Sequence, residues 1–319
     1  MLLRPENSAV NTSLAYLFPG QGSQAVGIGL QLYQQSPSAK AVLQEVDEAL
    51  KTPLTKIMFE GPEEELKNTI NAQPAILAVS LACVRAMEET LGPGGVSHPC
   101  LLAGHSLGEY TALAVSGVLN ISDTARLVRE RGRLMQEACE KKPGIMAAVL
   151  GLDEITLEEI CRQTNTYISN INSDDQIVIS GERVAMVRAL DMATARGAKR
   201  VIPLQVSGAF HSSLMEPARE GLVEAISSLE FQDPQIPIVA NCTGQPLTTA
   251  RSIKEELISQ ICSCVQWKRS IKYMVSSGVS SFLEVGPGKV LSGLVKRINQ
   301  DARVASVSDM TSILSLSSL

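Results

Sequence analysis

Ser106 lies in a sequence pattern that could make its hydroxyl a nucleophile. It is the centre of the Gly-x-Ser-x-Gly pentapeptide Gly104–Gly108, with the apolar run Leu101–Ala103 before it and the helix-forming run Tyr110–Ala114 after it. A serine held at a tight strand-to-helix turn is exposed, and the backbone N–H of the next residue can receive an oxyanion. The bare pentapeptide also occurs by chance in loops. Its place between a buried strand and a helix predicts a nucleophile elbow.

His211 is the candidate base for Ser106. The chain has three histidines, and His98 and His105 lie too near Ser106 in sequence to be obvious bases. His211 follows the serine, as the order of serine before histidine in hydrolase-like folds requires. A lone histidine is otherwise more often a satisfied core or surface residue, which is the alternative interpretation.

Arg131 is a charged residue on the expected apolar face of a helix. The helix is predicted over Asn120–Glu140, and at about 100° per residue Arg131 projects from the centre of its apolar stripe. An unpaired buried charge is costly, so the guanidinium must meet an anion. That anion is either a buried Glu or Asp of the protein or a substrate carboxylate held bidentately. The apolar stripe consists of Leu127, Val128, Leu134, Met135 and Ala138.

Composition and charge indicate the fold class of the protein that holds these residues. The 319 residues are 45% hydrophobic and 19% charged, which allows a large core and is long for one compact domain. Alternating strand and helix patterns, punctuated by 23 Gly and 15 Pro, predict an α/β fold. The net charge of −5 argues against a wide nucleic-acid-binding face.

The pattern predicts a large domain with a small domain inserted in it. Between Gly144 and Val206 the order is strand, helix, strand, strand, helix, strand, which is a ferredoxin-like motif. We therefore expect residues 1–142 and 207–319 to form a hydrolase-like large domain with a parallel sheet and the elbow, and 143–206 to form the small domain. The six predicted elements of the small domain are 145–150, 156–164, 167–172, 176–180, 183–196 and 200–205.

Two glycine-rich turns in the large domain allow more than one interpretation. Pro19–Ala25 reads as G-x-G-x-x-A, but Ala41–Leu50 looks helical where a Rossmann fold would have its second strand. A turn beside an active site is therefore a better interpretation than nucleotide binding. Gly286–Lys289 precedes the predicted helix Val290–Ile298 and could cradle an anion, with a structural turn near the site as the alternative.

A long apolar helix is predicted over Pro74–Leu91, with Pro74 in its first turn and Gly92 as its stop. Residues 92–95 then form a loop before the elbow strand. The other elements expected in the large domain are strands at 14–18, 236–240 and 282–285 and a helix that begins near Arg269.

The cysteines and the chain ends give expectations for the cellular compartment of the protein. The seven cysteines are odd in number and form no C-x-x-C pair, which predicts reduced thiols in a cytoplasmic protein without structural zinc. Residues 1–13 lack the apolar core of a signal peptide, and no segment approaches the length and apolarity of a membrane span. The Ser- and Leu-rich tail, residues 311–319, is expected to be a frayed or loosely packed end.

Five segments in this order resemble the malonyl-CoA:acyl-carrier-protein transacylase family. They are Phe18–Gln24, Gly104–Tyr110, Arg131, Ala209–Ser212 and Glu284–Gly288, and the similarity runs from about residue 14 to residue 300. Five motifs in the right order are far more specific than the pentapeptide alone. The resemblance implies transfer of a malonyl group from malonyl-CoA to the phosphopantetheine thiol of an acyl carrier protein, through a malonyl-serine intermediate.

The resemblance also implies roles for particular residues. Ser106 would be the nucleophile and His211 its base. Gln21 and Leu107 would supply the oxyanion-hole N–H groups, and Arg131 would bind the malonyl carboxylate.

Further roles are implied around this set. A carbonyl near a glutamine that precedes tryptophan orients the family's histidine, which corresponds to Gln266 here. Asn172 and Gln73 match positions that line the pocket. In larger synthases of the family, a phenylalanine just before the catalytic histidine goes with a malonyl substrate, and a serine there goes with a methylmalonyl substrate. Phe210 therefore implies a malonyl substrate. Its ring could fill the space that an α-methyl group needs. The Ala209-Phe210 pair resembles the polyketide type at least as much as the fatty-acid type.

The implied partners are malonyl-CoA and an acyl carrier protein, with no metal or other cofactor, no nucleic acid, no membrane, and a monomeric enzyme. Carrier proteins are usually acidic, so we expect a local basic docking face, for which the chain offers Lys268, Arg269, Lys272, Lys289, Lys296 and Arg297. Ordinary solvated helix surface is the equal alternative.

Two other functions remain open from the sequence. One is an acyl hydrolase that clears acyl chains from carrier proteins with Ser106 and His211, and the other is a non-catalytic docking protein of the same fold. Arg131 argues against the hydrolase, because neutral acyl chains give that charge no role.

Overall fold

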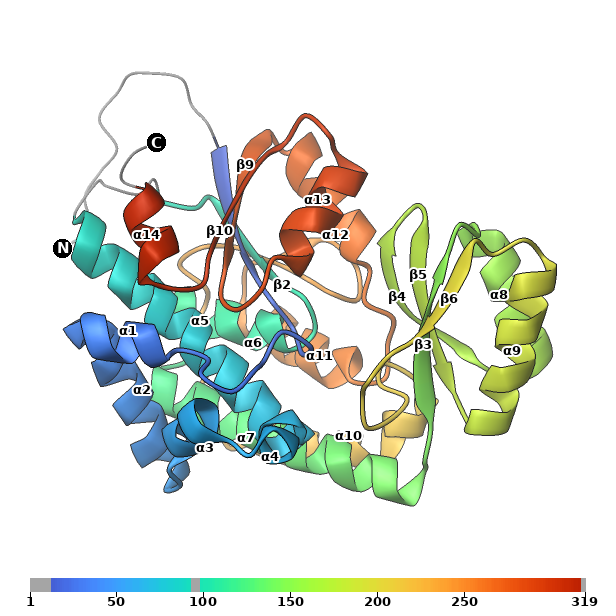
Figure 1. Cartoon of the computed structure of the whole chain (residues 1–319), viewed down its shortest axis with the longest axis horizontal. Coiled ribbons are helices and arrows are strands. Elements are labelled where there is room, and N and C mark those ends of the chain that lie inside the picture. The colour runs from blue at the N-terminus through green and yellow to red at the C-terminus, as the bar shows by residue number, and fades with distance from the viewer. Residues whose placement is uncertain (1–12, 93–97, 317–319) are drawn as a thin grey trace.

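The computed structural model describes residues 13–92 and 98–316, and its strands form two separate sheets (Figure 1). The expectations for the first twelve residues, for most of the loop at 92–95 and for the end of the tail lie outside the described residues. The α/β architecture with a hydrolase-like parallel sheet and a small second sheet is confirmed. The boundaries of the two domains stay a proposal.

The large sheet has six strands in the order β10-β9-β1-β2-β7-β8. All neighbours are parallel except β7 and β8, which pair antiparallel. The predicted strand at 236–240 is only two residues long. The strands are β1 (Ser13–Phe18), β2 (Leu101–Gly104), β7 (Ile238–Val239), β8 (Pro246–Leu247), β9 (Val279–Val285) and β10 (Arg303–Val307).

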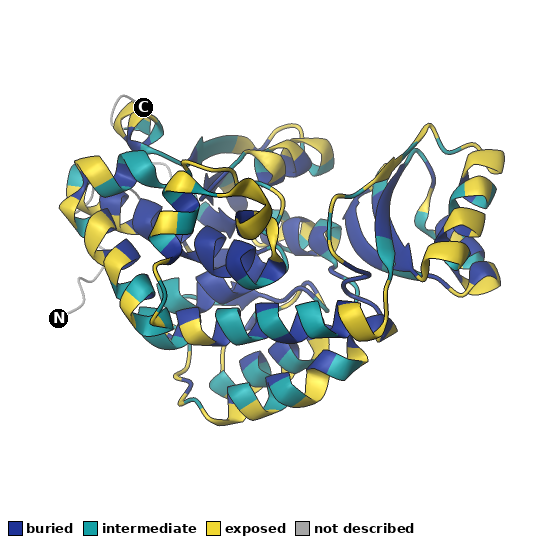
Figure 2. Ribbon diagram, turned by 60° about the horizontal axis from the view of Figure 1, so that its bottom comes forward, coloured by how far each residue is buried: buried dark blue, intermediate teal, exposed yellow. Residues whose placement is uncertain are grey.

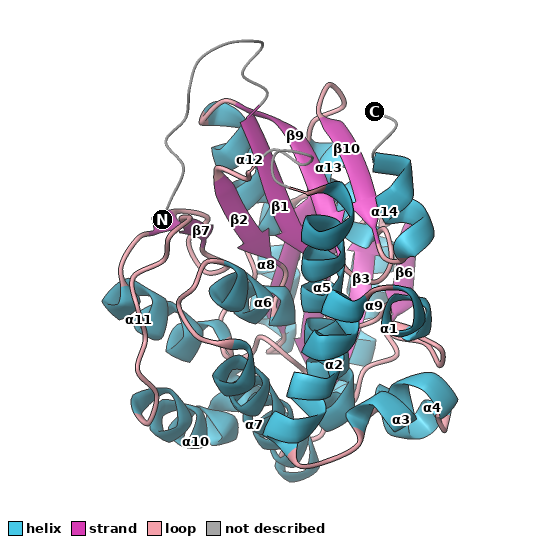
Figure 3. Ribbon diagram, turned by 90° about the vertical axis from the view of Figure 1, so that its left-hand side faces the viewer, coloured by secondary structure: helices cyan, strands magenta, loops and turns pink. Residues whose placement is uncertain are grey.

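Helices cover both faces of the large sheet because its strands are apolar on both sides. In β1, Tyr16 and Phe18 belong to the core cluster of α5 (Thr69–Leu91), α6 (Leu107–Val115) and α7 (Ile121–Lys141). Ala15 and Leu17 point to the other face, which α12 (Trp267–Ser276) and α13 (Val290–Ile298) cover. Such continuous apolar runs are typical of parallel strands buried on both faces. Figure 3 shows α5 lying across the strands.

Helix α5 begins five residues before the predicted start, and Pro74 lies inside it rather than in its first turn. It is also long and apolar enough to cross a membrane by length and composition, with a mean hydropathy of 1.4, so the expectation that no segment qualifies was wrong. Because 89% of that window is buried inside the protein, α5 is its central core helix. Figure 2 shows the buried residues, in dark blue, gathered in the interior of the molecule.

The small sheet has four antiparallel strands in the order β4-β5-β3-β6, the ferredoxin-like arrangement that the sequence predicts. One face packs on α8 (Glu154–Thr164) and α9 (Arg183–Ala195) to form a core of its own. The other face carries Met146, Ala148 and Val178 toward the large domain. The strands are β3 (Ile145–Leu150), β4 (Tyr167–Ser173), β5 (Gln176–Gly181) and β6 (Arg200–Pro203).

The C-terminal segment forms helix α14 (Met310–Leu316), which packs on α5 with Ile313 fully buried. The expectation of a loose end was wrong for this part, because its apolar residues recur at helical spacing and cover α5. The remaining helices are α1 (Leu30–Gln35), α2 (Pro37–Leu50), α3 (Leu54–Glu60), α4 (Glu63–Lys67), η1 (Ser213–Met215), α10 (Glu216–Ser227) and α11 (Ala250–Gln260).

Candidate active site

Ser106 stands at the turn between β2 and α6 with a strained backbone. It is the N-cap residue of α6, with φ 53° and ψ −106°. The turn is tight because glycines flank it: a Cβ on Gly104 would lie 1.8 Å from the carbonyl carbon of Gly108, and one on Gly108 would lie 2.0 Å from the carbonyl oxygen of Phe18. The turn has the geometry of a nucleophile elbow.

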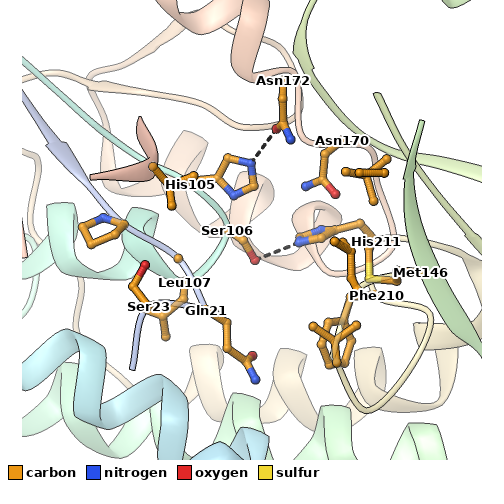
Figure 4. A pocket seen from close by; sticks show the side chains of 18 of the residues that line it. Gln21, Ser23, His105, Ser106, Leu107, Met146, Asn170, Asn172, Phe210 and His211 are labelled. Atoms are coloured by element: carbon orange, nitrogen blue, oxygen red, sulfur yellow. Dashed lines mark hydrogen bonds between the residues drawn. The ribbon is translucent and has the colours of Figure 1, made fainter. Parts of the chain in front are cut away.

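His211 reaches Ser106 from a segment 105 residues further along the chain. Its Nε2 lies 2.8 Å from Ser106 Oγ (Figure 4). Burial, and then the charge of Arg131, lower the pKa of His211 to about 3. The imidazole is therefore neutral near pH 7, as a general base must be.

The carbonyl that orients His211 is that of Gln260, which lies 2.9 Å from Nδ1. The resemblance implied a carbonyl near Gln266 for this role, and that assignment was wrong. The chain passes His211 at the end of α11 and then pairs with the small sheet at Asn170 and Val265. By Trp267 it has joined the core on the far face of the large sheet.

Arg131 is 1% exposed, as its place on the apolar face of α7 predicts. Its Nη1 donates to Gln73 Oε1 (2.6 Å), and its Nη2 donates to Gln260 Oε1 (2.9 Å) and to Ser106 Oγ (3.1 Å). The Tyr110 ring lies 5.1 Å from the guanidinium carbon. Its hydrogen-bond partners in the described chain are all neutral, so the first of the two alternatives, a carboxylate of the protein bound directly to Arg131, is not what the structure contains.

Gln73 does not line the cavity, contrary to what the resemblance implied. Its side chain is fully buried and lies behind Arg131, with Nε2 donating to Met135 Sδ at 3.3 Å. The early start of α5 accounts for this, because it places Gln73 within the helix, facing α7.

A cavity of about 240 Å³ opens in front of Ser106, between the large domain and the open face of the small sheet. Phe210 and Asn172 line it, as expected, and Asn172 Oδ1 lies 3.0 Å from His105 Nε2 (Figure 4). Gln21 and Leu107 line it beside Ser106. Its apolar side is made by Met135, Met146, Ala148, Val178, Leu204 and Val206.

Leu107 is the first residue of α6, so its N–H has no acceptor within the helix. The N–H of Ser106 itself is bound to Asn241 Oδ1 at 2.7 Å and is not available to a ligand. Gln21, in the loop after β1, donates from its side chain to Thr69 Oγ1 at 3.2 Å, which fixes the loop next to α5.

Three residues at the site were not singled out from the sequence: Glu109, Asn241 and Gln260. Asn241 binds both the Ser106 N–H and the carbonyl of Gly104, and its N–H and amide donate to Glu109. Glu109 could have been found from the sequence, because it is a charged residue in the otherwise apolar start of a helix. Asn241 could have been found because it is a polar residue at the end of a buried strand. Gln260, one of several polar residues on an amphipathic helix, offered none.

The proposed basic face is partly neutralised by the protein itself. Lys268 pairs with Asp174 at 3.0 Å and with Glu154 at 3.6 Å, Arg269 lies 3.9 Å from Glu154, and Lys272 lies 3.8 Å from Asp174. These pairs link α12 to the small domain. Among the residues with described placement, no group of three or more His, Cys, Asp or Glu side chains could hold a metal ion.

Comparison with known proteins gives one consistent result. The acyl transferase domain family matches residues 15–316. The malonyl CoA-acyl carrier protein transacylase of Bacillus subtilis strain 168 is 43% identical over 307 residues, 95% of each chain. That of Escherichia coli K12 is 40% identical over 291 residues, 90% of this chain and 93% of the relative.

Solved structures agree. A malonyl-transacylase in complex with its type II PKS acyl-carrier protein superposes with a TM-score of 0.92 at 38% identity, covering 96% of this chain and 99% of that one. The acyl-carrier-protein S-malonyltransferase of Bartonella henselae gives a TM-score of 0.91 at 42% identity, covering 95% and 98%.

Proposed function

The chain belongs to the acyl transferase family and, within it, to the malonyl CoA-acyl carrier protein transacylases, and from this we infer that it transfers the malonyl group of malonyl-CoA to the phosphopantetheine thiol of an acyl carrier protein. The relatives do not favour the alternative, an acyl hydrolase. The product would supply fatty-acid or polyketide chain building.

In the first half-reaction, Ser106 is loaded with malonyl. The neutral His211 takes the proton from Ser106 Oγ while that oxygen attacks the thioester carbonyl carbon. The N–H groups of Gln21 and Leu107 receive the resulting oxyanion. The carbon–sulfur bond then breaks, and His211 returns the proton to the departing sulfur, so that CoA leaves as a thiol.

In the second half-reaction, the carrier protein's pantetheine thiol replaces CoA. His211 accepts the thiol proton as the sulfur attacks the carbonyl carbon of malonyl-Ser106. The carbon–oxygen bond breaks, and the proton moves from His211 to Ser106 Oγ, which restores the free enzyme. Because the orienting group for His211 is a neutral carbonyl, the machinery is a dyad rather than a triad with a carboxylate.

One observation carries the substrate assignment: a buried arginine whose hydrogen-bond partners among the described residues are all neutral reaches the nucleophile, with Nη2 3.1 Å from Ser106 Oγ. A buried cation is stabilised by an anion that arrives with the substrate, and the planar guanidinium suits a carboxylate. The malonyl carboxylate meets this requirement, whereas an acetyl group does not.

The steps above use only side chains, backbone N–H groups and the two thiols, so we propose a cofactor-independent transferase. We also propose that it acts as a monomer. We also propose a cytoplasmic location, which the seven free cysteines support. The expected basic docking face reduces to Lys289, Lys296 and Arg297, because the other three cations are paired with acids of the small domain.

The experiment is to incubate the protein with malonyl-CoA and measure the intact mass, then add holo carrier protein. Wild type should gain one malonyl group on Ser106 and pass it to the carrier, and Ser106→Ala should gain none. A malonyl adduct on Ser106→Ala, or release of free malonate with no transfer to the carrier, would contradict the proposal.

A further inference from the structure

Glu109 is a buried carboxylate directly behind the elbow that the reaction steps do not use. It is 0% exposed and lies in the first turn of α6. Its Oε1 accepts hydrogen bonds from the N–H (2.9 Å) and the side-chain amide (3.0 Å) of Asn241, and its Oε2 accepts one from Gln260 Nε2 (2.7 Å). Both oxygens of Glu109 therefore act as acceptors.

Gln260 connects Glu109 to all three reactive residues, Ser106, His211 and Arg131. Its main-chain carbonyl accepts from His211 Nδ1, and its Oε1 accepts from Arg131 Nη2 at 2.9 Å. Its Nε2 donates to Glu109 and also to the carbonyl oxygen of Ser106, at 2.9 Å. One side chain thus joins the carboxylate, the elbow and the guanidinium.

The orientation of the Gln260 amide follows from its neighbours. Two acceptors, the Glu109 carboxylate and the Ser106 carbonyl, lie on one side, so the NH2 group must face them. The amide oxygen then faces Arg131. With the amide reversed, its NH2 group would meet the guanidinium, donor against donor, and its oxygen would meet two acceptors.

This arrangement holds the guanidinium of Arg131 in place and leaves it able to bind the carboxylate of a substrate. The carboxyl group of Glu109 lies one amide away from Arg131 and acts on it through Gln260, while the guanidinium keeps neutral hydrogen-bond partners among the described residues. A carboxylate in direct contact would compete with a substrate carboxylate for Arg131. Burial and the nearby Glu256 raise the pKa of Glu109 well above its usual value, and its three donors act in the opposite direction.

We propose that Glu109 is a positioning residue for substrate selection: it fixes the orientation of the Gln260 amide and thereby holds Arg131 beside Ser106, ready for the carboxylate of a dicarboxylic acyl group. This inference rests on the proposed function. It separates two roles within the site, since loss of Glu109 should impair recognition of the carboxylate more than the reactivity of Ser106.

The test compares two reactions of Ser106 in Glu109→Gln: loading from malonyl-CoA, and labelling by a neutral fluorophosphonate that needs no carboxylate contact. The variant keeps an oxygen for Asn241 but turns a donor toward Gln260. We expect the rate of malonyl loading to fall about tenfold relative to fluorophosphonate labelling. Equal loss in both reactions, or no loss in either, would overturn the proposal.

Glu256→Gln is the matched control. Glu256 is a second buried carboxylate of the same region, but it accepts from the Cys242 N–H and has no bond to Gln260. The ratio of the two rates should stay at its wild-type value. The same fall in this control would mean that general loss of buried charge is responsible, and would overturn the proposal.

Gln260→Met carries the test if Glu109→Gln does not fold. It removes the amide but keeps the main-chain carbonyl that binds His211, and the ratio should again fall about tenfold. A wild-type ratio in Gln260→Met would overturn the inference. Failure of the proposed function looks different: wild type would then be labelled by the fluorophosphonate but would not take malonyl from malonyl-CoA.

Discussion

Arg131 shows how a buried charge can be kept available for a ligand. Its neighbours Gln73 and Gln260 offer amide oxygens, which bind a guanidinium but do not neutralise it. The sequence could predict that Arg131 is buried, because its position on the apolar face of α7 follows from helical periodicity. It could not identify the two glutamines, because they come from helices whose packing no local pattern encodes.

Arg131→Ala should reduce malonyl loading about 100-fold, since the substrate carboxylate loses a charged, bidentate partner. Fluorophosphonate labelling of Ser106 should fall far less. The measurement is the rate of each reaction by intact mass. Arg129→Ala is the control, because Arg129 is on the same helix but binds Asn71 away from the cavity, and its rates should match wild type. Equal losses in both reactions of Arg131→Ala would make the arginine structural only.

The loading rate should be insensitive to pH between about 5 and 8, because the pKa of His211 is lowered to about 3 and the base stays unprotonated across that range. The lowered pKa of His211 also makes the free energy of unfolding depend on pH. The contribution of neutral His211 is fully present above its unfolded pKa of about 6.5 and is lost as the pH falls from there toward 3. A pH–rate profile of malonyl loading checks the first point. An inflection near 6.5 would contradict it.

At the scale of elements, the elbow depends on contacts between backbones. Gly104 and Gly108 permit β2 and α6 to approach each other and the end of β1. The sequence identified this turn because glycines at a fixed spacing are a local signal. The start of α5 was missed, because Pro74 resembles a first-turn residue. The turn that precedes Pro74 is held by α7, where Gly132 packs against Thr69 and Ile70.

Gly108→Ala should destabilise the protein by about 3 kcal/mol or more, because its Cβ would overlap the Phe18 carbonyl. Gly293→Ala is the matched control: it lies inside α13 with no heavy atom within 4 Å of an added Cβ. That change should stabilise the helix by about 0.5–1 kcal/mol. Urea unfolding measures both, and equal effects would contradict the steric explanation.

At the scale of the whole molecule, the cavity exists because two sheets face each other. The alternation of strand and helix patterns along the sequence was enough to predict both sheets and the ferredoxin-like motif of the small one. Their relative placement was not predictable, because it depends on pairs between distant segments, such as Lys268 with Asp174 and His105 with Asn172. The first pair partly neutralises the expected docking surface.

Asn172→Ala should weaken the contact between the small sheet and the elbow by about 0.5–1.5 kcal/mol, because it removes the hydrogen bond to the half-buried His105 Nε2. Hydrogen exchange of β4 and thermal melting measure this. Asn170→Ala is the control: Asn170 lines the same cavity, and its side chain makes no hydrogen bond to another residue in the described ranges. A larger loss in Asn170→Ala than in Asn172→Ala would contradict the role given to His105.

The positive φ angles of Ser106 (53°) and His211 (55°) affect how this protein could be improved. Non-glycine residues in that region carry a conformational penalty. Glycine at position 106 would relieve it at the loss of one small side chain, whereas glycine at position 211 would also remove a buried imidazole and its two hydrogen bonds. Laboratory selection for heat resistance alone would therefore favour inactive variants at position 106, and a screen for more stable versions of this enzyme must score turnover in every round.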